Sequence, residues 1–338
     1  MIAFAVSCKK SPDDGNGSNN GGNGMVEMTP YEWISPYGFD DIVIPEDNKL
    51  YVERIALGKQ LFYDNRLSNN GESCNTCHVQ SMGFAAEGLS DFDNGQAKMP
   101  LMNLAWHKNF MWSGRVSGTL EHVMEVELTK RFSTDINKVN AIADYRDKFR
   151  KYYGVNEISV QDLSKALAQF MRILVSKNTK YEKALIGQAQ FTFEEMKGRE
   201  IFFNEKGDCF HCHVHFLTTD DLLHNNGLDS IYTKEIDKGY FNVSGNPSDL
   251  GKFRTPNLRN VALRTSYMHD GRFKTLEEVI EFYDHQSHRG IPNIDPNMVK
   301  SNHEYGLGLT EEEKRYLVAF LKTFTDTVMV NEPMFRQD

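Results

Sequence analysis

The sequence lacks several features that mark common classes of protein. No stretch of the 338 residues approaches the roughly 20 consecutive apolar residues that a membrane-spanning helix needs. Positive charge is in the minority, with 38 lysines and arginines against 47 aspartates and glutamates, and the net charge of -9 argues against binding to nucleic acid. Long alternation of apolar and polar residues is also absent, which argues against a fold built on sheets. The remaining composition, 40% hydrophobic and 25% charged, is that of an ordinary globular chain long enough for two domains.

Cysteine is scarce, and its placement is the most informative feature of the chain. Four of the five cysteines fall in two pentapeptides of the form Cys-x-x-Cys-His, at positions 74–78 and 209–213. In such a pentapeptide the two thiols can form thioether bonds to the vinyl groups of a haem, and the histidine can ligate its iron. The residues predicted to hold two covalently bound c-type haems are Cys74, Cys77, His78, Cys209, Cys212 and His213.

Two other uses of the Cys-x-x-Cys pattern explain less of the sequence. A zinc site built from the two pairs of thiols is one alternative. A disulfide or a thioredoxin-like redox pair is another. Each of them leaves both trailing histidines without a role, so two haems are the favoured interpretation.

The fifth cysteine, Cys8, points to a tethered N-terminus. The short apolar segment 1–7 and the sequence Ala-Val-Ser-Cys at 5–8 resemble the end of a bacterial lipoprotein signal. The Gly/Asn/Ser-rich run 11–24 cannot bury apolar surface and is expected to be flexible. We therefore predict a signal remnant and tether over residues 1–30, lipid-anchored through Cys8; a disordered N-terminus with an unused thiol is the alternative. Because haem is attached covalently on the periplasmic side, the predicted location is the periplasm.

One unit is used twice along the chain. The segment Leu-Gly-Lys-Gln-Leu-Phe (57–62) precedes the first haem motif, and Lys-Gly-Arg-Glu-Ile-Phe (197–202) precedes the second. Downstream of each motif, the nine-residue segments 119–127 and 275–283 match at Thr, Leu, Glu, Val and Glu without a gap. Their last residues, Glu127 and Tyr283, stand on the helix face that otherwise carries apolar residues. Each of these two residues is therefore expected to approach the distal side of its haem.

Helical patterns account for most of the chain. The capping-box spacing of Thr275 and Glu278 predicts the start of a helix there, and Thr310 is expected to cap a last helix. Further helices are predicted over 160–176 and 192–204, with a hinge at 187–190. The expected fold is all-α, with an N-terminal domain over 31–184 and a C-terminal domain over 185–338, each wrapped around one haem.

These motifs together resemble the family of di-haem cytochrome c peroxidases and MauG. Besides the haem motifs, the resemblance is carried by Trp-Ser-Gly-Arg (112–115), Arg-Thr-Pro-Asn-Leu-Arg-Asn (254–260), Tyr-Met-His-Asp-Gly-Arg-Phe (267–273) and the closing segment 309–323. It extends over nearly everything from about Tyr31 onward. It implies two cytochrome-c-like domains with unequal haems, of which the N-terminal one is peroxidatic and the six-coordinate C-terminal one transfers electrons. A tryptophan relays charge between the haems in this family, and Trp112 stands at its position.

The resemblance leaves the second ligand of the C-terminal iron open between two residues. In the peroxidases this ligand is usually a methionine, whereas the corresponding position here is Tyr283. A tyrosine there looks like MauG, which oxidises tryptophans in a partner protein, and a phenolate lowers the haem potential relative to a methionine. Met268 is the fallback ligand if Tyr283 only packs.

The resemblance also bears on the distal side of the N-terminal haem. Many of the peroxidases carry a histidine soon after the first motif, but no histidine occurs here between His78 and His107. We therefore expect the N-terminal iron to be open to peroxide in the diferric state, with His107 beside the site or on the surface. The family moves the peroxide protons with a distal glutamate. Glu127 is the predicted residue, with Glu125 as the fallback.

Calcium often lies between the domains in this family, and its ligand positions fall near Met99, Arg264 and Ser266. An arginine in place of an oxygen ligand argues against the ion, so calcium is considered but not favoured.

Three functions follow from these expectations. The first is a periplasmic peroxidase that reduces hydrogen peroxide to water with electrons from a small cytochrome c, a cupredoxin or a quinol-linked carrier; the negative net charge leaves room for a basic partner. The second is a MauG-like oxidase of a protein or organic substrate, which Tyr283 favours. The third is a di-haem electron carrier without catalysis. Relatives often dimerise, so a homodimer is also considered.

Overall fold

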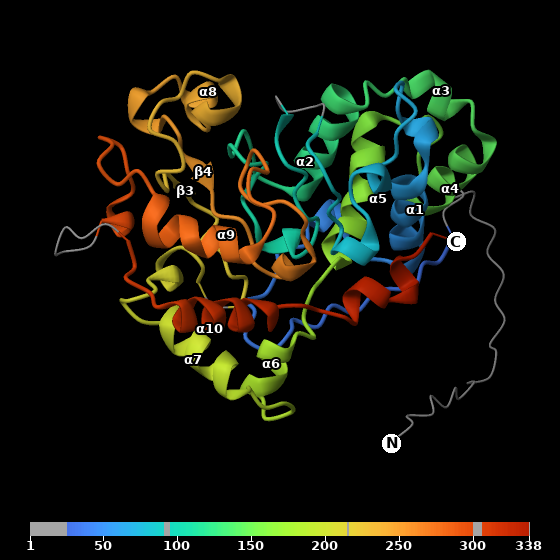
Figure 1. Cartoon of the computed structure of the whole chain (residues 1–338). Helices are drawn as coiled ribbons and strands as arrows, with labels where there is room; N and C mark the ends of the chain where they lie inside the picture. Colours follow the sequence, from blue (N-terminus) through green and yellow to red (C-terminus); the bar gives the residue numbers. More distant parts are fainter. Residues whose placement is uncertain (1–25, 91–94, 215, 300–305, 338) are drawn as a thin grey trace.

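The computed structural model describes residues 26–90, 95–214, 216–299 and 306–337 (Figure 1). The predicted tether, with Cys8, lies outside these residues apart from its last few positions. In the described part of the chain, no helix combines the length and the apolar character that crossing a membrane requires.

The described chain is rich in helix and has little sheet, as the sequence predicts. Its α-helices are α1 (Val52–Tyr63), α2 (Leu120–Val126), α3 (Ile136–Asn140), α4 (Ala143–Tyr153), α5 (Val160–Ile173), α6 (Lys180–Leu185), α7 (Phe193–Phe202), α8 (Phe241–Ser244), α9 (Leu276–Glu281) and α10 (Glu311–Lys322). Two antiparallel pairs, β1 (Asn109–Phe110) with β2 (Val116–Ser117) and β3 (Leu223–His224) with β4 (Phe253–Arg254), depart from a purely helical fold. The sequence does not predict them because strands of two residues are too short to show alternation.

The helix starts follow the predicted capping chemistry. The Thr275 hydroxyl accepts a hydrogen bond from the Glu278 amide at 3.1 Å, and the Glu278 carboxylate accepts one from the Thr275 amide at 3.1 Å, which closes the capping box of α9. Thr310 and Glu313 form the same box at the start of α10. The other two predicted helices are α5, which ends three residues earlier than expected, at Ile173, and α7.

The sequence repeat is also a repeat of helix packing. Gly58 of α1 lies against α5, where a Cβ atom would overlap the carbonyl oxygen of Ala166. Its counterpart Gly198 of α7 lies against α10, where a Cβ atom would overlap the carbonyl oxygen of Tyr316. In both units a glycine therefore allows a helix that precedes the haem motif to approach a later helix more closely than any side chain would permit.

Two asparagines hold equivalent turns in the two units. Asn103 and Asn260 both have left-handed backbone conformations, with φ of 59° and 57°, and each precedes a 3₁₀ turn. The Asn103 amide donates to the carbonyl of Leu174, just after α5, and the Asn260 amide donates to that of Phe324, just after α10. Asparagine suits these positions because it tolerates φ above zero better than most residues.

Helices α2 and α9 both end in a π-helical turn. The turn Glu127–Arg131 follows α2, and the turn Phe282–Gln286 follows α9. Such turns widen a helix locally and often occur at functional sites. Glu127 begins the first π-helical turn and Tyr283 lies within the second, so both candidate distal residues stand where the helix geometry changes.

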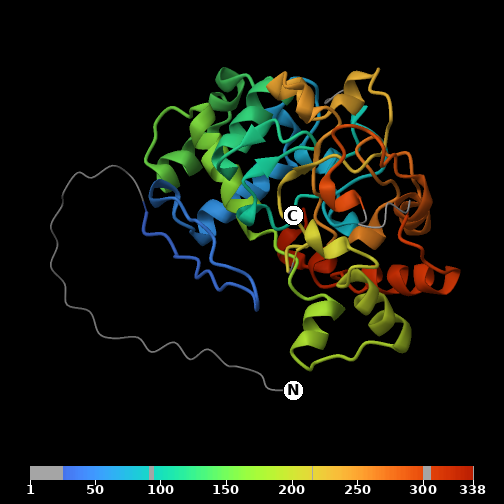
Figure 2. The same ribbon diagram turned by 90° about the vertical axis from the view of Figure 1, so that its left-hand side faces the viewer.

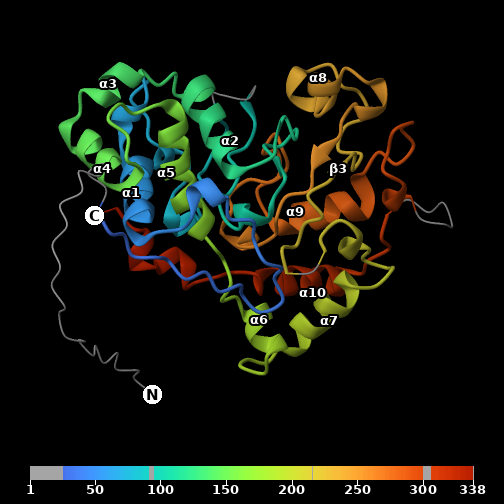
Figure 3. The same ribbon diagram turned by 180° about the vertical axis from the view of Figure 1, so that it is seen from behind.

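Buried apolar residues gather in two clusters, and the helices that carry them occupy different parts of the ribbon in Figures 1 and 3. The first is built mainly from α1, α2, α4 and α5, and the second from α6, α7, α9 and α10. The chain passes from one to the other between Leu174 and Tyr181, whereas the predicted hinge at 187–190 connects α6 to α7. At the C-terminus, Met329 and Phe335 return to the first cluster. Figure 2 views the chain from the left-hand side of Figure 1, where α8 and α9 lie. The division of the chain into domains at 184/185 stays a prediction.

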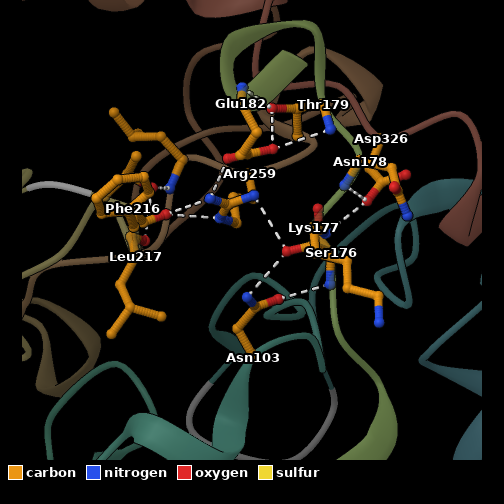
Figure 4. Close-up of polar contacts among 12 residues, drawn as sticks. Asn103, Ser176, Lys177, Asn178, Thr179, Glu182, Phe216, Leu217, Arg259 and Asp326 are labelled. Carbon is orange, nitrogen blue, oxygen red and sulfur yellow. Dashed lines mark hydrogen bonds and ion pairs between the residues drawn. The ribbon is translucent and has the colours of Figure 1, made fainter. Parts of the chain in front are cut away.

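A network of buried hydrogen bonds joins the two clusters around Arg259 (Figure 4). The guanidinium of Arg259 forms an ion pair with Glu182 of α6 and donates to the carbonyl oxygens of Ser176 at 3.1 Å and Phe216 at 2.7 Å. Ser176 is also held by Asn103, whose side-chain amide donates to the same carbonyl at 3.1 Å. The connecting segment after α5 is thus fixed from both sides.

Candidate active site

The first haem motif lies in the wall of a cavity in the N-terminal half. This cavity encloses about 1110 Å³, counting the part that opens to solvent. Cys74, Cys77 and His78 line it together with Glu127 and Trp112. The rest of its wall is mainly apolar and includes Leu104, Phe110, Val123, Met124, Leu128, Phe132, Leu167 and Met171.

The second haem motif lines a separate, larger cavity of about 1680 Å³, again counting its open part. Cys209, Cys212 and His213 stand in its wall with Met268 and Tyr283. Apolar residues again predominate, among them Phe202, Leu228, Phe253, Val261, Leu276, Val279, Ile280, Leu317 and Leu321. Among the described residues, no cluster of metal-ligating side chains combines the two pairs of cysteines, so the structure gives no support to a shared zinc site.

Both motif histidines form a hydrogen bond of the same kind through Nδ1. Nδ1 of His78 lies 3.0 Å from the carbonyl oxygen of Phe84, and Nδ1 of His213 lies 2.9 Å from that of Thr218. A carbonyl can only accept, so Nδ1 carries the proton and Nε2 keeps a free lone pair for a metal. Burial lowers the pKa of His78 to about 4 and also lowers the pKa of His213. Both imidazoles are therefore neutral at neutral pH, as an iron ligand must be.

These features fit two covalently bound haems. Each cavity combines two thiols at the spacing that haem attachment requires, an adjacent neutral imidazole and a wall of apolar side chains. No disulfide joins the four cysteines. The two haems would be held through Cys74, Cys77 and His78 in the first cavity and through Cys209, Cys212 and His213 in the second.

Trp112 belongs to the wall that separates the two cavities. It lines both of them, as do Met99, Pro100 and Arg254. The indole is buried, and its Nε1 donates to the carbonyl oxygen of Ala97 at 2.7 Å. A residue that relays charge between haems in the two cavities would have to lie in this wall.

The two glutamates proposed for the distal role lie in different surroundings. Glu127 lines the first cavity. Glu125 does not, and its carboxylate accepts a hydrogen bond from Gln161 of α5 at 3.0 Å. Of the two, only Glu127 is placed to reach a molecule bound in the cavity.

Tyr283 and Met268 both approach the interior of the second cavity, near Asn226. The side-chain amide of Asn226 donates to the Tyr283 hydroxyl at 3.1 Å and lies 3.9 Å from the Met268 sulfur. Burial raises the pKa of Tyr283 to about 12. Both Tyr283 and Met268 line this cavity, so their positions alone do not decide which of them would ligate a metal.

Sequence reasoning missed the polar residues that support the shared wall. Arg254 is buried there and forms an ion pair with Asp221 at 3.2 Å. Asp221 also pairs with His107 at 2.8 Å. His107 is therefore a buried residue behind the wall, not a surface one, and it lines neither cavity. The run 254–260 could have signalled Arg254, but Asp221 has no motif around it.

The region where calcium was considered holds a guanidinium instead. Nη2 of Arg264 donates to the carbonyl oxygen of Lys98 at 2.8 Å, and Nε donates to that of Ser266 at 3.4 Å. Carbonyl oxygens are ligands that calcium prefers, but these two are already engaged by a cation. The residues present do not fit a calcium ion here.

Comparison with known proteins agrees with these features. The family model for di-haem cytochrome c peroxidase matches residues 52–190. The chain is 32% identical over 292 residues to the methylamine utilization protein MauG of Methylorubrum extorquens, covering 82% of this chain and 80% of that protein. It is 30% identical over 299 residues to the cytochrome c551 peroxidase of Nitrosomonas europaea, covering 84% of this chain and 82% of that protein.

A solved structure extends the similarity to three dimensions. The crystal structure of a MauG-like protein associated with microbial copper homeostasis matches with a TM-score of 0.81 and 31% identity. The match covers 90% of this chain and 99% of that one. The chain therefore belongs to the family of di-haem cytochrome c peroxidases and MauG.

Proposed function

We propose that the protein is a periplasmic, c-type di-haem peroxidase that reduces hydrogen peroxide to water. One observation carries the proposal: among the described residues that line the first cavity there is a single histidine, His78, and a single carboxylate, Glu127. His78 would hold the iron from one side. No second histidine in this lining competes with peroxide for the other side, where Glu127 provides an acid–base group.

The proton chemistry falls to Glu127. A haem in the first cavity would supply an iron that exchanges electrons with peroxide. The Glu127 carboxylate accepts the proton of one peroxide oxygen and returns it to the other oxygen, which leaves as water. The complete reaction consumes two electrons and two protons for each peroxide and yields two water molecules.

Electrons are proposed to enter through the second cavity and to cross the shared wall at Trp112. The second haem would be held by His213, with Tyr283 as the proposed second ligand and Met268 as the alternative. The electron donor would be a small cytochrome c, a cupredoxin or a quinol-linked carrier, and the net charge of -9 leaves room for a basic one. A periplasmic location follows from covalent haem attachment, and a lipid anchor at Cys8 is proposed with it.

Two variants and one spectrum test the proposal. The ferric protein is expected to show a high-spin EPR signal from an iron with one open position. Glu127→Gln is expected to lower kcat/KM for peroxide, measured with reduced cytochrome c, by about 10²–10⁴-fold, because the proton shuttle is lost. Glu125→Gln is the matched control, since it removes the same charge two residues away and outside the cavity. Equal losses in both variants would contradict the role given to Glu127.

A MauG-like oxidase is the second candidate, and the presence of Tyr283 in the second cavity favours it. The same site would then oxidise a protein or organic substrate at the surface. Rapid peroxide consumption with reduced cytochrome c supports the peroxidase. Slow turnover with a long-lived two-electron-oxidised protein supports the oxidase. A ferric protein without any high-spin signal would contradict both and indicate an electron carrier.

A further inference from the structure

Arg264 is a cation without a counter-charge in the wall of the second cavity. Its side chain lines that cavity, and its Nη1 atom is shut off from solvent with no hydrogen-bond partner. Nη2 and Nε are engaged only by the carbonyl oxygens of Lys98 and Ser266. Burial lowers the pKa of Arg264 to about 10, which still leaves the guanidinium charged at neutral pH.

Three arginines that are more deeply buried than Arg264 each have a carboxylate partner. Arg172 pairs with Glu121, Arg254 with Asp221 and Arg259 with Glu182. An isolated buried charge is costly, and proteins rarely keep one without a partner. No described carboxylate forms an ion pair with Arg264, so the free Nη1 indicates that an anion belongs in the cavity.

Arg289 shares two of these properties: its buried Nη1 also lacks a hydrogen-bond partner, and it also lines the second cavity. However, its Nη2 donates to the backbone carbonyl of Tyr283 at 2.6 Å. Substituting Arg289 would therefore disturb a candidate ligand. The hydrogen bonds of Arg264 go to Lys98 and Ser266 and not to Tyr283 or Met268, so its effect can be measured separately.

The position of Arg264 also joins the two halves of the molecule. Lys98 belongs to the chain between the first haem motif and α2, whereas Arg264 and Ser266 follow the 3₁₀ turn Val261–Leu263 in the second half. A cation that binds carbonyl oxygens from both halves does the structural work of a bridging metal ion. Unlike a metal ion, it is covalently part of the chain and cannot be removed by a chelator.

We propose that Arg264 is a positioning residue that supplies a permanent positive charge between the two halves, binds a carboxylate of the haem in the second cavity and replaces a bridging divalent cation. This rests on the proposal that the second cavity holds a haem, but not on peroxidase activity. A fixed positive charge beside a haem favours its reduced form, because reduction lowers the positive charge of the iron.

The test is a redox titration of the holoprotein. Arg264→Gln is expected to shift the reduction equilibrium of the second haem about tenfold toward the ferric form, equal to about 59 mV for a one-electron couple. Arg264→Lys keeps the charge and is expected to recover most of that shift. Arg272→Gln is the matched control, because it removes a partly exposed arginine that pairs with Asp229 and Asp270 and does not line the cavity.

A second experiment uses only the wild-type protein. The potentials and the thermal unfolding midpoint of the wild-type protein are expected to stay the same in EDTA and in added CaCl₂. A shift with EDTA, or an Arg264→Gln protein whose second haem titrates as in the wild type, would overturn the proposal. Haem content is measured first by the pyridine haemochrome method: a protein with fewer than two haems would contradict the proposed function itself.

Discussion

At the scale of single residues, the second cavity offers two candidate ligands within reach of one amide. Asn226 faces both the Tyr283 hydroxyl and the Met268 sulfur. The two ligands would shift the reduction potential of the haem in opposite directions. An anionic phenolate stabilises ferric iron and lowers the potential, whereas a thioether raises it. Substitution can therefore distinguish them by the direction of a change and not only by its size.

We expect Tyr283→Phe to shift the second haem at least about tenfold toward its reduced form, equal to about 59 mV. The reason is that the substitution removes the oxygen and leaves the ring to fill the same space. The midpoint potential and the EPR spectrum of the ferric protein are the measurements. Met268→Leu is the comparison variant and is expected to leave both unchanged. The reverse pattern would identify Met268 as the ligand.

The residues that sequence could indicate are those fixed by spacing. The haem-attachment residues follow from two pentapeptides, and the repeat singles out Glu127 and Tyr283. The supporting charges could not be found in this way. Asp221 meets His107 and Arg254 only because loops far apart in the sequence converge, and the structure shows them at 2.8 and 3.2 Å. A carboxylate that is positioned by tertiary contacts has no periodic pattern around it in the sequence.

At the scale of elements, the repeated helix pair depends on glycine at the crossing. A methyl group at position 198 would meet the carbonyl oxygen of Tyr316 and the Cβ atom of Phe320. Alanine in a helix gains about 1 kcal/mol over glycine from its higher propensity. Overpacking against a backbone that cannot move away costs about 1–3 kcal/mol. The substitution is therefore expected to lower the free energy of unfolding.

Gly198→Ala is therefore expected to lower the thermal unfolding midpoint of the holoprotein, followed by circular dichroism. Gly290→Ala is the matched control. No heavy atom lies within 4 Å of a Cβ built at Gly290, so that change is expected to alter stability by less than about 0.5 kcal/mol. An unfolding midpoint for Gly198→Ala at or above that of the wild type would show that α7 and α10 can separate at little cost.

The elements also show where sequence patterns lose resolution. Capping boxes predict the starts of α9 and α10 because they depend on two side chains three residues apart. The sequence does not predict the π-helical turns after α2 and α9, since the apolar stripes that indicate these helices end within the turns. Their place at Glu127 and Tyr283 can be seen only in the folded chain.

At the scale of the whole molecule, the two clusters are held together by polar contacts buried between them. Arg259 reaches the connecting segment through Ser176 and the second haem loop through Phe216 (Figure 4). Two residues after Phe216, the carbonyl of Thr218 accepts the hydrogen bond from His213. The guanidinium thus connects the junction of the halves to the loop that orients the second motif histidine.

Breaking this junction is expected to be costly, and the cost should depend on which partner remains. Arg259→Gln leaves Glu182 buried without its cation, which typically costs about 3–5 kcal/mol. Adding Glu182→Gln removes that stranded charge, so the double variant is expected to be more stable than Arg259→Gln alone. Thermal unfolding of the wild type, the two single variants and the double variant gives the coupling energy directly. Strictly additive losses would mean that the ion pair does not act as a unit.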